Sequence, residues 1–438
     1  MTTLPKISFV IPLFNHLAET QKMLTSLLTS LPVGLPHEII LVDDGSTDGT
    51  REWLKAVQDA RIRVHLNERN LGYAATNNVG VGMASGEFLG LLNNDLLFEP
   101  GWLEPMLAVL QAPQLNAGVV GNVQFRVAGG KLDHAGVQLN PNAQFGHIQT
   151  LNEDAPRYTK VLAVTGACLL LYKADFDAQG GFDERFINGC EDIDLCFKLR
   201  GAGKAVYVAN TSRIRHHVSL SRELNNLHNV RNSRHLFSRW RKLIKQELAT
   251  LWATLLQAGP QAYHELLSGQ LCPEFVATPH TAARVIAEAM LLREEIHWAR
   301  GLGEPNPNLE VAKQFTAQGL SYMPNMNGYA MTPNTEFSFS GLRSARNFYL
   351  CGRTTVEQAK QPIVITITVN NIQVKTVTLT MGRNVNVGII DPILLQGLTN
   401  YFHVESHFVD EQGQSLGDAS AAIFITYIII DDQIVSDL

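Results

Sequence analysis

The sequence of 438 residues has few cysteines and no excess of basic charge. Its five cysteines are odd in number and stand in apolar surroundings, which excludes a disulfide framework or a zinc site and indicates a reducing compartment. Lysine and arginine total 35 against 41 aspartates and glutamates, for a net charge of −6. This balance argues against general nucleic-acid binding, so no nucleic-acid partner is expected.

Long apolar runs are also missing. No segment reaches the ~18 consecutive apolar residues that a membrane-spanning helix needs. The nearest candidate, residues 161–172, is short and contains Thr165 and Gly166. We expect no signal peptide, because the first apolar run is interrupted at Asn15 and His16. Together these absences predict a cytoplasmic protein.

Two common nucleotide-binding patterns are absent or incomplete. The GxxxxGK[ST] pattern does not occur, which excludes a P-loop enzyme. Gly80 and Gly82 have the spacing of a GxGxxG fingerprint but lack its third glycine and its strand–turn–helix setting. A nucleotide-dependent dehydrogenase is therefore disfavoured.

What the sequence does contain is a set of apolar segments that end abruptly in polar residues. Residues 7–12, 38–42 and 86–92 contain apolar runs rather than an alternating pattern, which with the helical patterns between them predicts a doubly wound, mostly parallel sheet. Ligands bind at the carboxyl ends of such strands. The crevice should therefore collect Phe14, Asn15, Asp44, the loop from Asn70 to Asn78, and Asp95.

A purely structural explanation exists for parts of this pattern. Asn and Asp favour turns on their own account, and Ser46 or Thr47 can cap the following helix. Capping leaves Asp43 and Asp44 unexplained, because adjacent carboxylates repel one another unless a cation or a donor such as a base N–H uses them. An Asp at a strand end can also fix a divalent cation against phosphate oxygens.

The order of these segments resembles the family 2 glycosyltransferases of GT-A fold. The family's Pro-x-Phe/Tyr-Asn corresponds to residues 12–15, and its Val-Asp-Asp-Gly-Ser-x-Asp to residues 42–48. Its Asn-x-Gly-(Phe/Tyr)-Ala-x-x-Asn-Asn-x-Gly block corresponds to residues 70–80. The metal-motif strand carries Leu-Asn-Asn-Asp at residues 92–95, a form similar to rhamnosyltransferase-like members, where the commoner Asp-x-Asp would supply one more carboxylate.

The resemblance implies a site for a UDP- or dTDP-sugar. The Asn-Asn-Asp form leans toward dTDP-rhamnose, and UDP-glucose, UDP-galactose and their N-acetyl forms stay open. Asp44 is expected to contact the base edge of the nucleotide, and Asp95 to hold Mn²⁺ or Mg²⁺. The full set implied to bind the nucleotide is Pro12, Phe14, Asn15, Asp43, Asp44, Asn70, Gly72, Tyr73, Asn78 and Asn94.

A further block, residues 164–221, resembles the acceptor side of the family, and Gly166 and Ala167 are expected to lie at the acceptor. From the residues alone, Glu191, Asp192 and Asp194 crowd the first turn of a predicted helix, where the helix dipole stabilises carboxylates and acidic residues are common. The resemblance implies that Asp192 is the general base of an inverting transfer. Glu191 and Asp194 would position the acceptor or the loop.

His216 and His217 follow a strand-like segment at residues 206–214. Beside Arg213 and Arg215, such a pair can simply be solvated. The resemblance instead places a histidine next to the diphosphate and the metal, where a neutral imidazole completes the coordination. His216 aligns best, and His217 is the alternative.

These features predict an inverting hexosyl- or deoxyhexosyltransferase in bacterial glycan or glycoconjugate synthesis. Its acceptor would be a glycan, a lipid-linked glycan or a protein side chain. The alternative is a catalytically silent carbohydrate-binding or assembly protein on the same scaffold. The Asn-Asn-Asp form supports that alternative, and the joint presence of Asp44, Asp95, Asp192 and His216 opposes it.

We expect three domains: the GT-A domain at 1–221, a helical segment and linker at 222–308, and an antiparallel β-sandwich at 309–438. Basic residues from Arg231 to Lys245 alternate with apolar ones, which predicts an amphipathic helix. Such a helix can touch a membrane at its inner face or, as we favour, pack back on the catalytic domain with a solvated basic face. The sandwich aromatics, Tyr401 and Phe402 among them, can stack on a sugar or fill a core, and the module can also serve homo-oligomer assembly.

Overall fold

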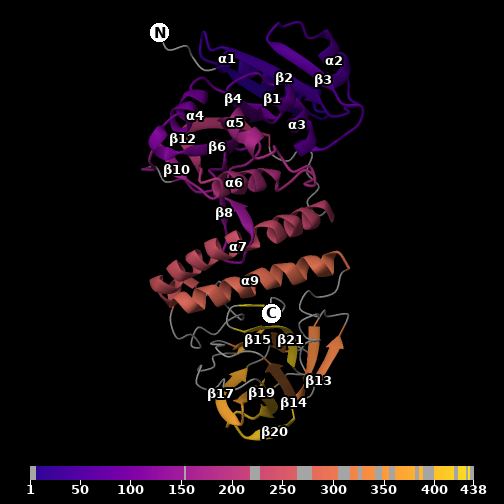
Figure 1. Cartoon of the computed structure of the whole chain (residues 1–438), viewed down its shortest axis with the longest axis vertical. Helices are drawn as coiled ribbons and strands as arrows, with labels where there is room; N and C mark the ends of the chain where they lie inside the picture. Colours follow the sequence, from indigo (N-terminus) through magenta and orange to yellow (C-terminus); the bar gives the residue numbers. More distant parts are fainter. Residues whose placement is uncertain are drawn as a thin grey trace. The chain divides into compact units, whose positions relative to one another are not determined.

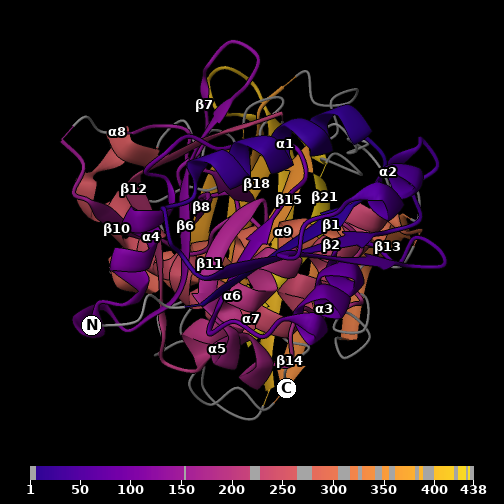
Figure 2. The same cartoon turned by 90° about the horizontal axis from the view of Figure 1, so that it is seen from above.

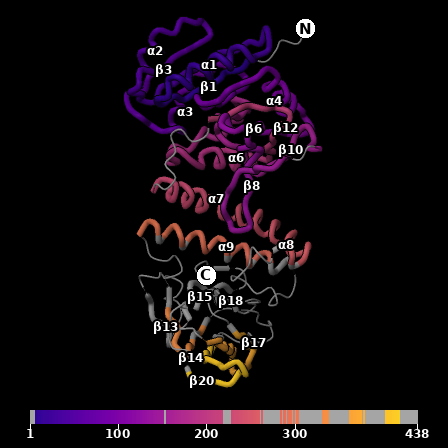
Figure 3. The backbone as a smooth tube through the Cα atoms, turned by 180° about the vertical axis from the view of Figure 1, so that it is seen from behind, coloured from indigo at the N-terminus to yellow at the C-terminus, as the bar shows by residue number. Residues whose placement is uncertain are grey.

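The computed structural model of the chain describes residues 6–151, 154–217, 227–263, 279–303, 316–323, 328–340, 348–354, 361–379, 384–387, 399–418, 423–430 and 433–434. The remaining residues are drawn grey in Figure 3. The chain divides into two compact units, residues 1–139 with 145–240 and residues 140–144 with 241–438. Both predicted domain boundaries, 221–222 and 308–309, lie outside the described residues.

The first unit is built on a mostly parallel sheet (Figure 1). Its main path runs β3 (Ile62–Leu66), β2 (His37–Asp43), β1 (Ile7–Leu13), β4 (Phe88–Leu92), β11 (Cys168–Tyr172), β6 (Ala117–Arg126), β12 (Ala205–His216) and β10 (Tyr158–Lys160). The short strands β5 (Leu96–Leu97) and β7 (Leu132–His134) pair with β12 and β6. The neighbours of β1 and β2 are parallel, as are β6 and β12, so the predicted mostly parallel GT-A sheet is confirmed.

One central strand departs from a purely parallel arrangement. β11 runs antiparallel to both of its neighbours, β4 and β6. It therefore begins at the edge where β4 ends, and the Asn93 backbone N–H donates to the Ala167 carbonyl across that edge at 2.8 Å. The consequence is that the turn before β11 lies at the carboxyl edge of β4, together with the polar residues that follow that strand.

Helices cover both faces of this sheet because its strands are apolar on both sides. Side chains of α1 (Leu17–Ser30) and α4 (Leu103–Leu110) share a buried cluster with Phe9 and Ile11 of β1. On the other face, α3 (Tyr73–Met83) packs so closely that a Cβ on Gly80 would collide with Val10. Figure 2 shows α1 and α3 on opposite sides of β1 and β2. The remaining elements are α2 (Thr50–Ala56), η1 (Pro113–Leu115), β8 (Val137–Leu139), β9 (Phe145–His147), α5 (Lys173–Ala178) and α6 (Glu191–Gly201).

The long helix α7 (Leu227–Ala258) is interrupted at Trp240, whose φ of −114° and ψ of 17° are not helical. Residues up to Trp240 belong to the first unit and those from Arg241 on to the second. In the first part, Leu236 and Phe237 are buried, and the Phe237 ring lies 5.6 Å from that of Phe145. The predicted amphipathic helix therefore packs its apolar residues inside the protein.

The second unit combines helices with an antiparallel sheet that fits the predicted β-sandwich. Its further helices are α8 (Pro260–Tyr263) and α9 (Pro279–Gly301). Its strands are β13 (Thr316–Met323), β14 (Gly328–Ser340), β15 (Phe348–Thr354), β16 (Ile363–Val369), β17 (Ile372–Leu379), β18 (Asn384–Val387), β19 (Thr399–Val409), β20 (Ser415–Asp418), β21 (Ile423–Ile430) and β22 (Gln433–Ile434). Along β16 every second residue from Ile363 to Val369 is buried, as the alternation predicts. Phe402 is buried, whereas Tyr401 is 65% exposed.

Part of the basic stretch of α7 is ion-paired within the second unit. Arg241 donates to Glu288 and also binds Glu295, with Nε 2.8 Å from its Oε1. Lys245 Nζ lies 2.8 Å from Glu288, whose side chain is fully buried. None of the helices in the described parts of the chain combines the length and apolar character needed to cross a bilayer.

Candidate active site

The first two polar segments interlock at the carboxyl ends of β1 and β2. The Asn15 backbone N–H donates to Ser46 Oγ at 2.8 Å, and Asn15 Oδ1 accepts from the Thr47 N–H at 2.8 Å. Asn15 has the left-handed φ of 57° that this arrangement requires. The capping explanation for Ser46 and Thr47 is wrong, because the N-cap of α2 is Gly49 and the side chain that accepts from the first helical N–H, of Thr50, is Asp48, at 3.2 Å. Of the neighbouring predicted residues, Pro12 lies inside β1 and Phe14 is 41% exposed.

Donors from the protein itself offset the expected repulsion between Asp43 and Asp44. The fully buried Asp43 accepts from the Gly45 and Ser46 N–H groups at 3.1 and 3.3 Å and lies 3.5 Å from Arg51 Nε. Asp44, 4% exposed, accepts from Asn67 Nδ2 at 3.0 Å. Its two oxygens also accept from the N–H groups that open the next loop, Leu71 at 2.8 Å and Gly72 at 3.0 Å. Asp44 therefore shapes the predicted nucleotide loop.

The loop that Asp44 holds leads into α3. Asn70 Oδ1 accepts from the Gly72 N–H at 3.1 Å, and Gly72 takes the positive φ of 86° at the start of the helix. Tyr73 follows, with its N–H on Asn188 Oδ1 at 3.0 Å and its hydroxyl on the Gly166 carbonyl at 2.7 Å. Burial raises the pKa of the Tyr73 hydroxyl well above its ordinary value, and the nearby charges of Glu191 and Asp192 raise it further.

Asn78, also predicted to bind the nucleotide, lies one turn further along α3 and faces another segment. Its side-chain amide pairs with both backbone groups of Phe182, Nδ2 to the carbonyl and Oδ1 from the N–H, each at 3.0 Å. Nδ2 also donates to Glu184 at 3.0 Å. The Asn78 side chain thus joins α3 to the turn that contains Gly181 and Asp183.

The third strand end, after β4, carries the predicted metal residues. Asn94 Nδ2 donates to Thr20 Oγ1 of α1 at 2.9 Å. Asp95 Oδ1 lies 3.3 Å from His216 Nε2, because β5 pairs Leu96 with His216 at the end of β12. The His217 N–H donates to the Asp95 carbonyl at 3.1 Å. The sequence-predicted residues Asp95, His216 and His217 therefore come together.

Several buried polar atoms at this edge make no hydrogen bond to the protein. They are Asn93 Oδ1, His216 Nδ1 and His217 Nε2, whereas Asp95 Oδ1 has the ion-pair contact with His216 Nε2. Among the described residues, no group of three His, Cys, Asp or Glu side chains is arranged to hold a metal ion. A magnesium-type ion is commonly bound through one or two protein ligands together with substrate phosphates and water, so Asp95 and His216 fit such an ion as a partial ligand set.

Asp192, in the first turn of α6, contacts the turn before β11. Its Oδ2 accepts from the Gly166 N–H at 2.7 Å and its Oδ1 from the Ile193 N–H at 2.8 Å. The Asp192 side chain stays partly exposed. Glu191 is buried and accepts from the Gly189 N–H at 2.7 Å. The predicted acceptor residue Gly166 thus contacts both Tyr73 and the predicted base.

Asp194 faces away from this turn. It is fully buried, accepts from Trp240 Nε1 at 2.7 Å, and forms ion pairs with Lys198 at 3.2 Å and Arg239 at 3.4 Å. The sequence did not point to Arg239 or Trp240 as site residues, because their partners lie more than 40 residues away along the chain.

A histidine that the sequence analysis did not single out lies under the same turn. His134 of β7 is fully buried, and its Nε2 accepts from the Thr165 N–H at 3.5 Å. Burial lowers its pKa well below the ordinary value, with smaller contributions from His147 and His216. No local pattern marks it, since β7 has only three residues.

Comparison with known proteins gives a family match for this part of the chain. Residues 8–178 match the family model described as Glycosyl transferase family 2. The uncharacterized protein y4gI of Sinorhizobium fredii is 34% identical over 231 residues, 50% of this chain and 25% of that protein. The O-antigen biosynthesis protein RfbC of Myxococcus xanthus is 32% identical over 230 residues, 50% of this chain and 18% of that protein. The chain therefore spans a quarter or less of the length of these two relatives.

Among solved structures, the crystal structure of GalNAc-T7 with UDP, GalNAc and Mn²⁺ aligns with a TM-score of 0.49 and 16% identity. The alignment covers 70% of this chain and 59% of that one.

Proposed function

Because the first unit of this chain belongs to glycosyl transferase family 2 and has the GT-A fold, we propose that the protein is an inverting glycosyltransferase. It moves a hexosyl or deoxyhexosyl group from a UDP- or dTDP-sugar to an acceptor hydroxyl. Asp192 is the general base that accepts the proton of that hydroxyl.

One observation carries the proposal: the Gly166 turn joins the two halves of the site. The Tyr73 hydroxyl binds the Gly166 carbonyl, and the Asp192 carboxylate binds the Gly166 N–H, both at 2.7 Å. Tyr73 starts the helix that follows the predicted nucleotide loop, and Asp192 starts the helix of the predicted acceptor side. A sugar held by the loop and an acceptor held beside Asp192 would meet at this turn.

The reaction then needs no covalent enzyme intermediate. The acceptor oxygen forms a new bond to the anomeric carbon from the face opposite the phosphate, and its proton passes to Asp192. The bond between the anomeric carbon and the phosphate oxygen breaks, and its electron pair leaves with the nucleoside diphosphate. Attack from the opposite face inverts the configuration.

Negative charge grows on the leaving diphosphate during this step, and the site must stabilise that charge. Asp95 and His216 would hold Mn²⁺ or Mg²⁺, which when bound offsets that charge. Asp44, through the N–H groups of Leu71 and Gly72, orders the loop expected to hold the nucleotide. His217 stands as the alternative metal residue, since its buried Nε2 has no hydrogen-bond partner in the described part of the protein.

The name of one relative supports a proposal for the biological setting. RfbC is named for O-antigen biosynthesis, which favours a bacterial glycan or glycoconjugate acceptor for this chain. Contact with a membrane-bound acceptor, a cytoplasmic location and homo-oligomer assembly belong to the same proposal.

A donor screen combined with one substitution tests the assignment. UDP-, dTDP- and GDP-sugars are added to the protein with Mn²⁺, Mg²⁺ or EDTA, and both thermal stabilisation and nucleoside diphosphate release are measured. We expect stabilisation by one nucleotide class and slow diphosphate release. Asp192→Asn should keep the stabilisation and lower the release by about 10²–10⁴-fold, the usual contribution of a general base.

Glu52→Gln is the matched control, because Glu52 is an exposed carboxylate of α2 outside the site. Near-normal release by Asp192→Asn would remove Asp192 from the role of base. No response to any donor would favour the catalytically silent scaffold.

A further inference from the structure

Side chains in the first part of α7 bind the segment that leads into α6. Four of its side chains, the α7 clamp, make these contacts: Asn232, His235, Arg239 and Trp240. Asn232 holds Ile187 by both backbone groups, accepting from the N–H at 3.2 Å and donating to the carbonyl at 2.8 Å. The loop fixed in this way ends at Cys190, directly before Glu191 and Asp192.

This loop has a backbone that needs support. Asn188 and Cys190 both have left-handed φ angles, 53° and 73°, and neither is glycine. Such residues cost of order 1–3 kcal/mol each and persist only when their surroundings fix them. The Asn188 side chain also accepts from the Tyr73 N–H at 3.0 Å, so the loop touches the start of α3 as well.

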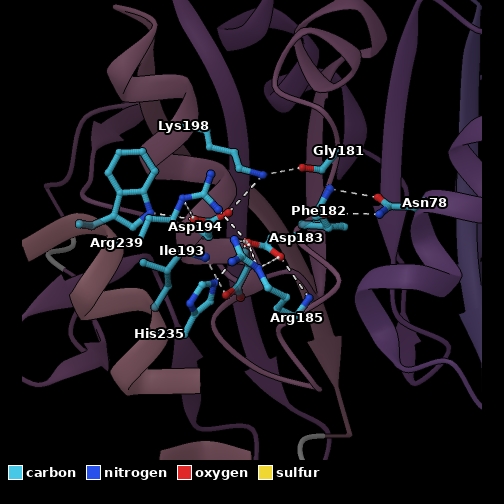
Figure 4. Close-up of polar contacts among 12 residues, drawn as sticks. Asn78, Gly181, Phe182, Asp183, Arg185, Ile193, Asp194, Lys198, His235 and Arg239 are labelled. Atoms are coloured by element: carbon cyan, nitrogen blue, oxygen red, sulfur yellow. Dashed lines mark hydrogen bonds and ion pairs between the residues drawn. The ribbon is translucent and has the colours of Figure 1, made fainter. Parts of the chain in front are cut away.

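Arg239 is the centre of the clamp because it bridges two carboxylates. Its Nη1 lies 2.7 Å from Asp183 Oδ2 and its Nε 3.4 Å from Asp194 Oδ1. Figure 4 shows Arg239 together with these two carboxylates. Asp183 belongs to the turn before the loop and Asp194 to the first turn of α6. A single guanidinium, planar and with donors on two edges, thereby ties the turn to the helix.

The environment makes this bridge costly to break. Asp194 is fully buried and the Asp183 side chain is 10% exposed. Removing one partner of a buried ion pair leaves an uncompensated charge, which is strongly destabilising locally. Lys198 reinforces the same connection, since its Nζ lies 3.2 Å from Asp194 and donates to the Gly181 carbonyl at 2.9 Å.

Helix geometry links this bridge to Asp192. Residues two apart in an α-helix are separated by about 200° around the axis, so Asp192 and Asp194 project from nearly opposite sides of α6. Arg239, Trp240 and Lys198 hold the Asp194 side, while Asp192 meets the Gly166 turn on the other. Fixing the Asp194 side therefore fixes the rotation of the helix and the direction in which Asp192 points.

We propose that Arg239 is a positioning residue for the transfer reaction, acting through α6 to orient the Asp192 carboxylate toward the acceptor hydroxyl. The inference rests on the proposed function. Arg239 contacts the two carboxylates that flank the loop and acts through them. Its loss should lower turnover while leaving donor binding intact.

The test uses the full chain and the donor sugar that the screen selects. Arg239→Met removes the charge, and Arg239→Lys keeps a charge that can reach only one of the two carboxylates at a time. We expect Arg239→Met to lower kcat for diphosphate release by about 10- to 100-fold, the usual effect of a misplaced catalytic group, with KM for the donor unchanged. Arg239→Lys should remain at least about fivefold slow for the same reason.

Arg185→Met is the matched control. Arg185 binds Asp183 as closely as Arg239 does, with Nη2 2.7 Å from Oδ2, but its side chain is 68% exposed and it interacts with Asp194 through longer-range Coulomb attraction rather than an ion pair. It should leave kcat within about twofold of the wild type, because exposed ion pairs contribute little. Equal losses in Arg185→Met and Arg239→Met would overturn the bridging role.

A double variant separates positioning from general support. If Arg239 acts through Asp192, then Arg239→Met combined with Asp192→Asn should be no slower than Asp192→Asn alone. A further loss of tenfold or more in the double variant would show that Arg239 acts independently and overturn the inference. If Arg239→Met does not fold, Trp240→Phe, which removes the donor to Asp194 and keeps a ring, takes its place in the same cycle.

The same assays distinguish failure of the proposed function from failure of the Arg239 inference alone. The proposed function fails if Asp192 is not the general base. In that case Asp192→Asn itself turns over the donor normally. If Asp192→Asn is slow and Arg239→Met is fast, only the positioning role of Arg239 is overturned.

Hydrogen exchange of residues 187–193 adds a readout independent of turnover. Arg239→Met should raise exchange there while leaving residues 17–30 of α1 unchanged. Unchanged exchange would contradict the clamp.

Discussion

Replacing Asp44 distinguishes two roles for this carboxylate: contact with the base of a nucleotide, or support of the loop at residues 67–73. If it only contacts the base of a nucleotide, its replacement should weaken donor binding and leave the free protein unaffected. In the structure it instead accepts hydrogen bonds from Asn67, Leu71 and Gly72 while 4% exposed. Asp44→Asn should therefore destabilise the protein before any nucleotide is added.

The magnitude follows from the three contacts. An asparagine keeps one acceptor oxygen, so it can satisfy Asn67 Nδ2 and the Leu71 N–H, which both bind Oδ1. Its amide nitrogen then faces the Gly72 N–H, where the aspartate offers Oδ2 at 3.0 Å. Losing one charge-assisted hydrogen bond, and leaving two donors opposed in a buried position, costs about 2–4 kcal/mol.

Urea unfolding of the nucleotide-free protein measures this cost. With a slope near 3 kcal/mol per molar, at the upper end for small domains and suited to a unit of this size, the midpoint should fall by about 1 M. Hydrogen exchange of residues 67–73 should rise in the same variant, and Glu52→Gln serves as an exposed control. An unchanged midpoint together with lost donor binding would refute the structural role and restore base contact as the main role of Asp44.

The remaining predictions concern pH, metal and packing. Burial raises the pKa of Glu38, but hydrogen bonds from Ser8 and Ser85 and the charge of Lys6 outweigh it and lower the pKa from 4.5 to about 2. A lowered pKa stabilises the fold above pH 4.5 and the contribution is lost as pH falls toward 2. The difference in unfolding free energy between wild type and Glu38→Gln should thus shrink by about 3 kcal/mol across that interval, and a pH-independent difference would contradict it. Asp95→Asn and His216→Gln should each abolish the extra donor-induced rise in Tm that Mn²⁺ or Mg²⁺ gives, as EDTA should in the wild type, and a retained metal effect would point to other ligands. Gly86→Ala should cost about 1–3 kcal/mol in urea unfolding, because a Cβ there would lie 2.7 Å from the Ser8 backbone nitrogen, and a neutral result would mean that the strand can shift.

The fold of the first unit was predictable because its signals are local. Continuous apolar runs predicted strands at 7–12, 38–42 and 86–92, and the structure has them at Ile7–Leu13, His37–Asp43 and Phe88–Leu92. The direction of β11 was not predictable in this way. An apolar segment has the same composition in either orientation, and only its neighbours β4 and β6 fix its direction.

The sequence predicted which edge of the sheet carries the candidate site, but it did not predict what each polar residue binds there. The meeting of Asp95 with His216 followed from strand ends and from the family resemblance. Asp43 accepts hydrogen bonds from the Gly45 and Ser46 N–H groups and pairs with Arg51. These contacts could not be deduced from composition, because any residue supplies a backbone N–H. The bridge from Arg239 to Asp183 joins residues 56 positions apart and lacks a local signature.

Exposure and the kind of partner divide the predicted carboxylates into two groups. Asp43, Asp44 and Asp194 are 0–4% exposed and accept from donors of the chain itself, so they maintain the shape of the edge. Asp95 is paired instead with His216, the other predicted metal residue, at 3.3 Å, and the Asp192 side chain is partly exposed. Of these five carboxylates, Asp95 and Asp192 are therefore the two that we expect to take a metal ion and a proton in the proposed sugar transfer.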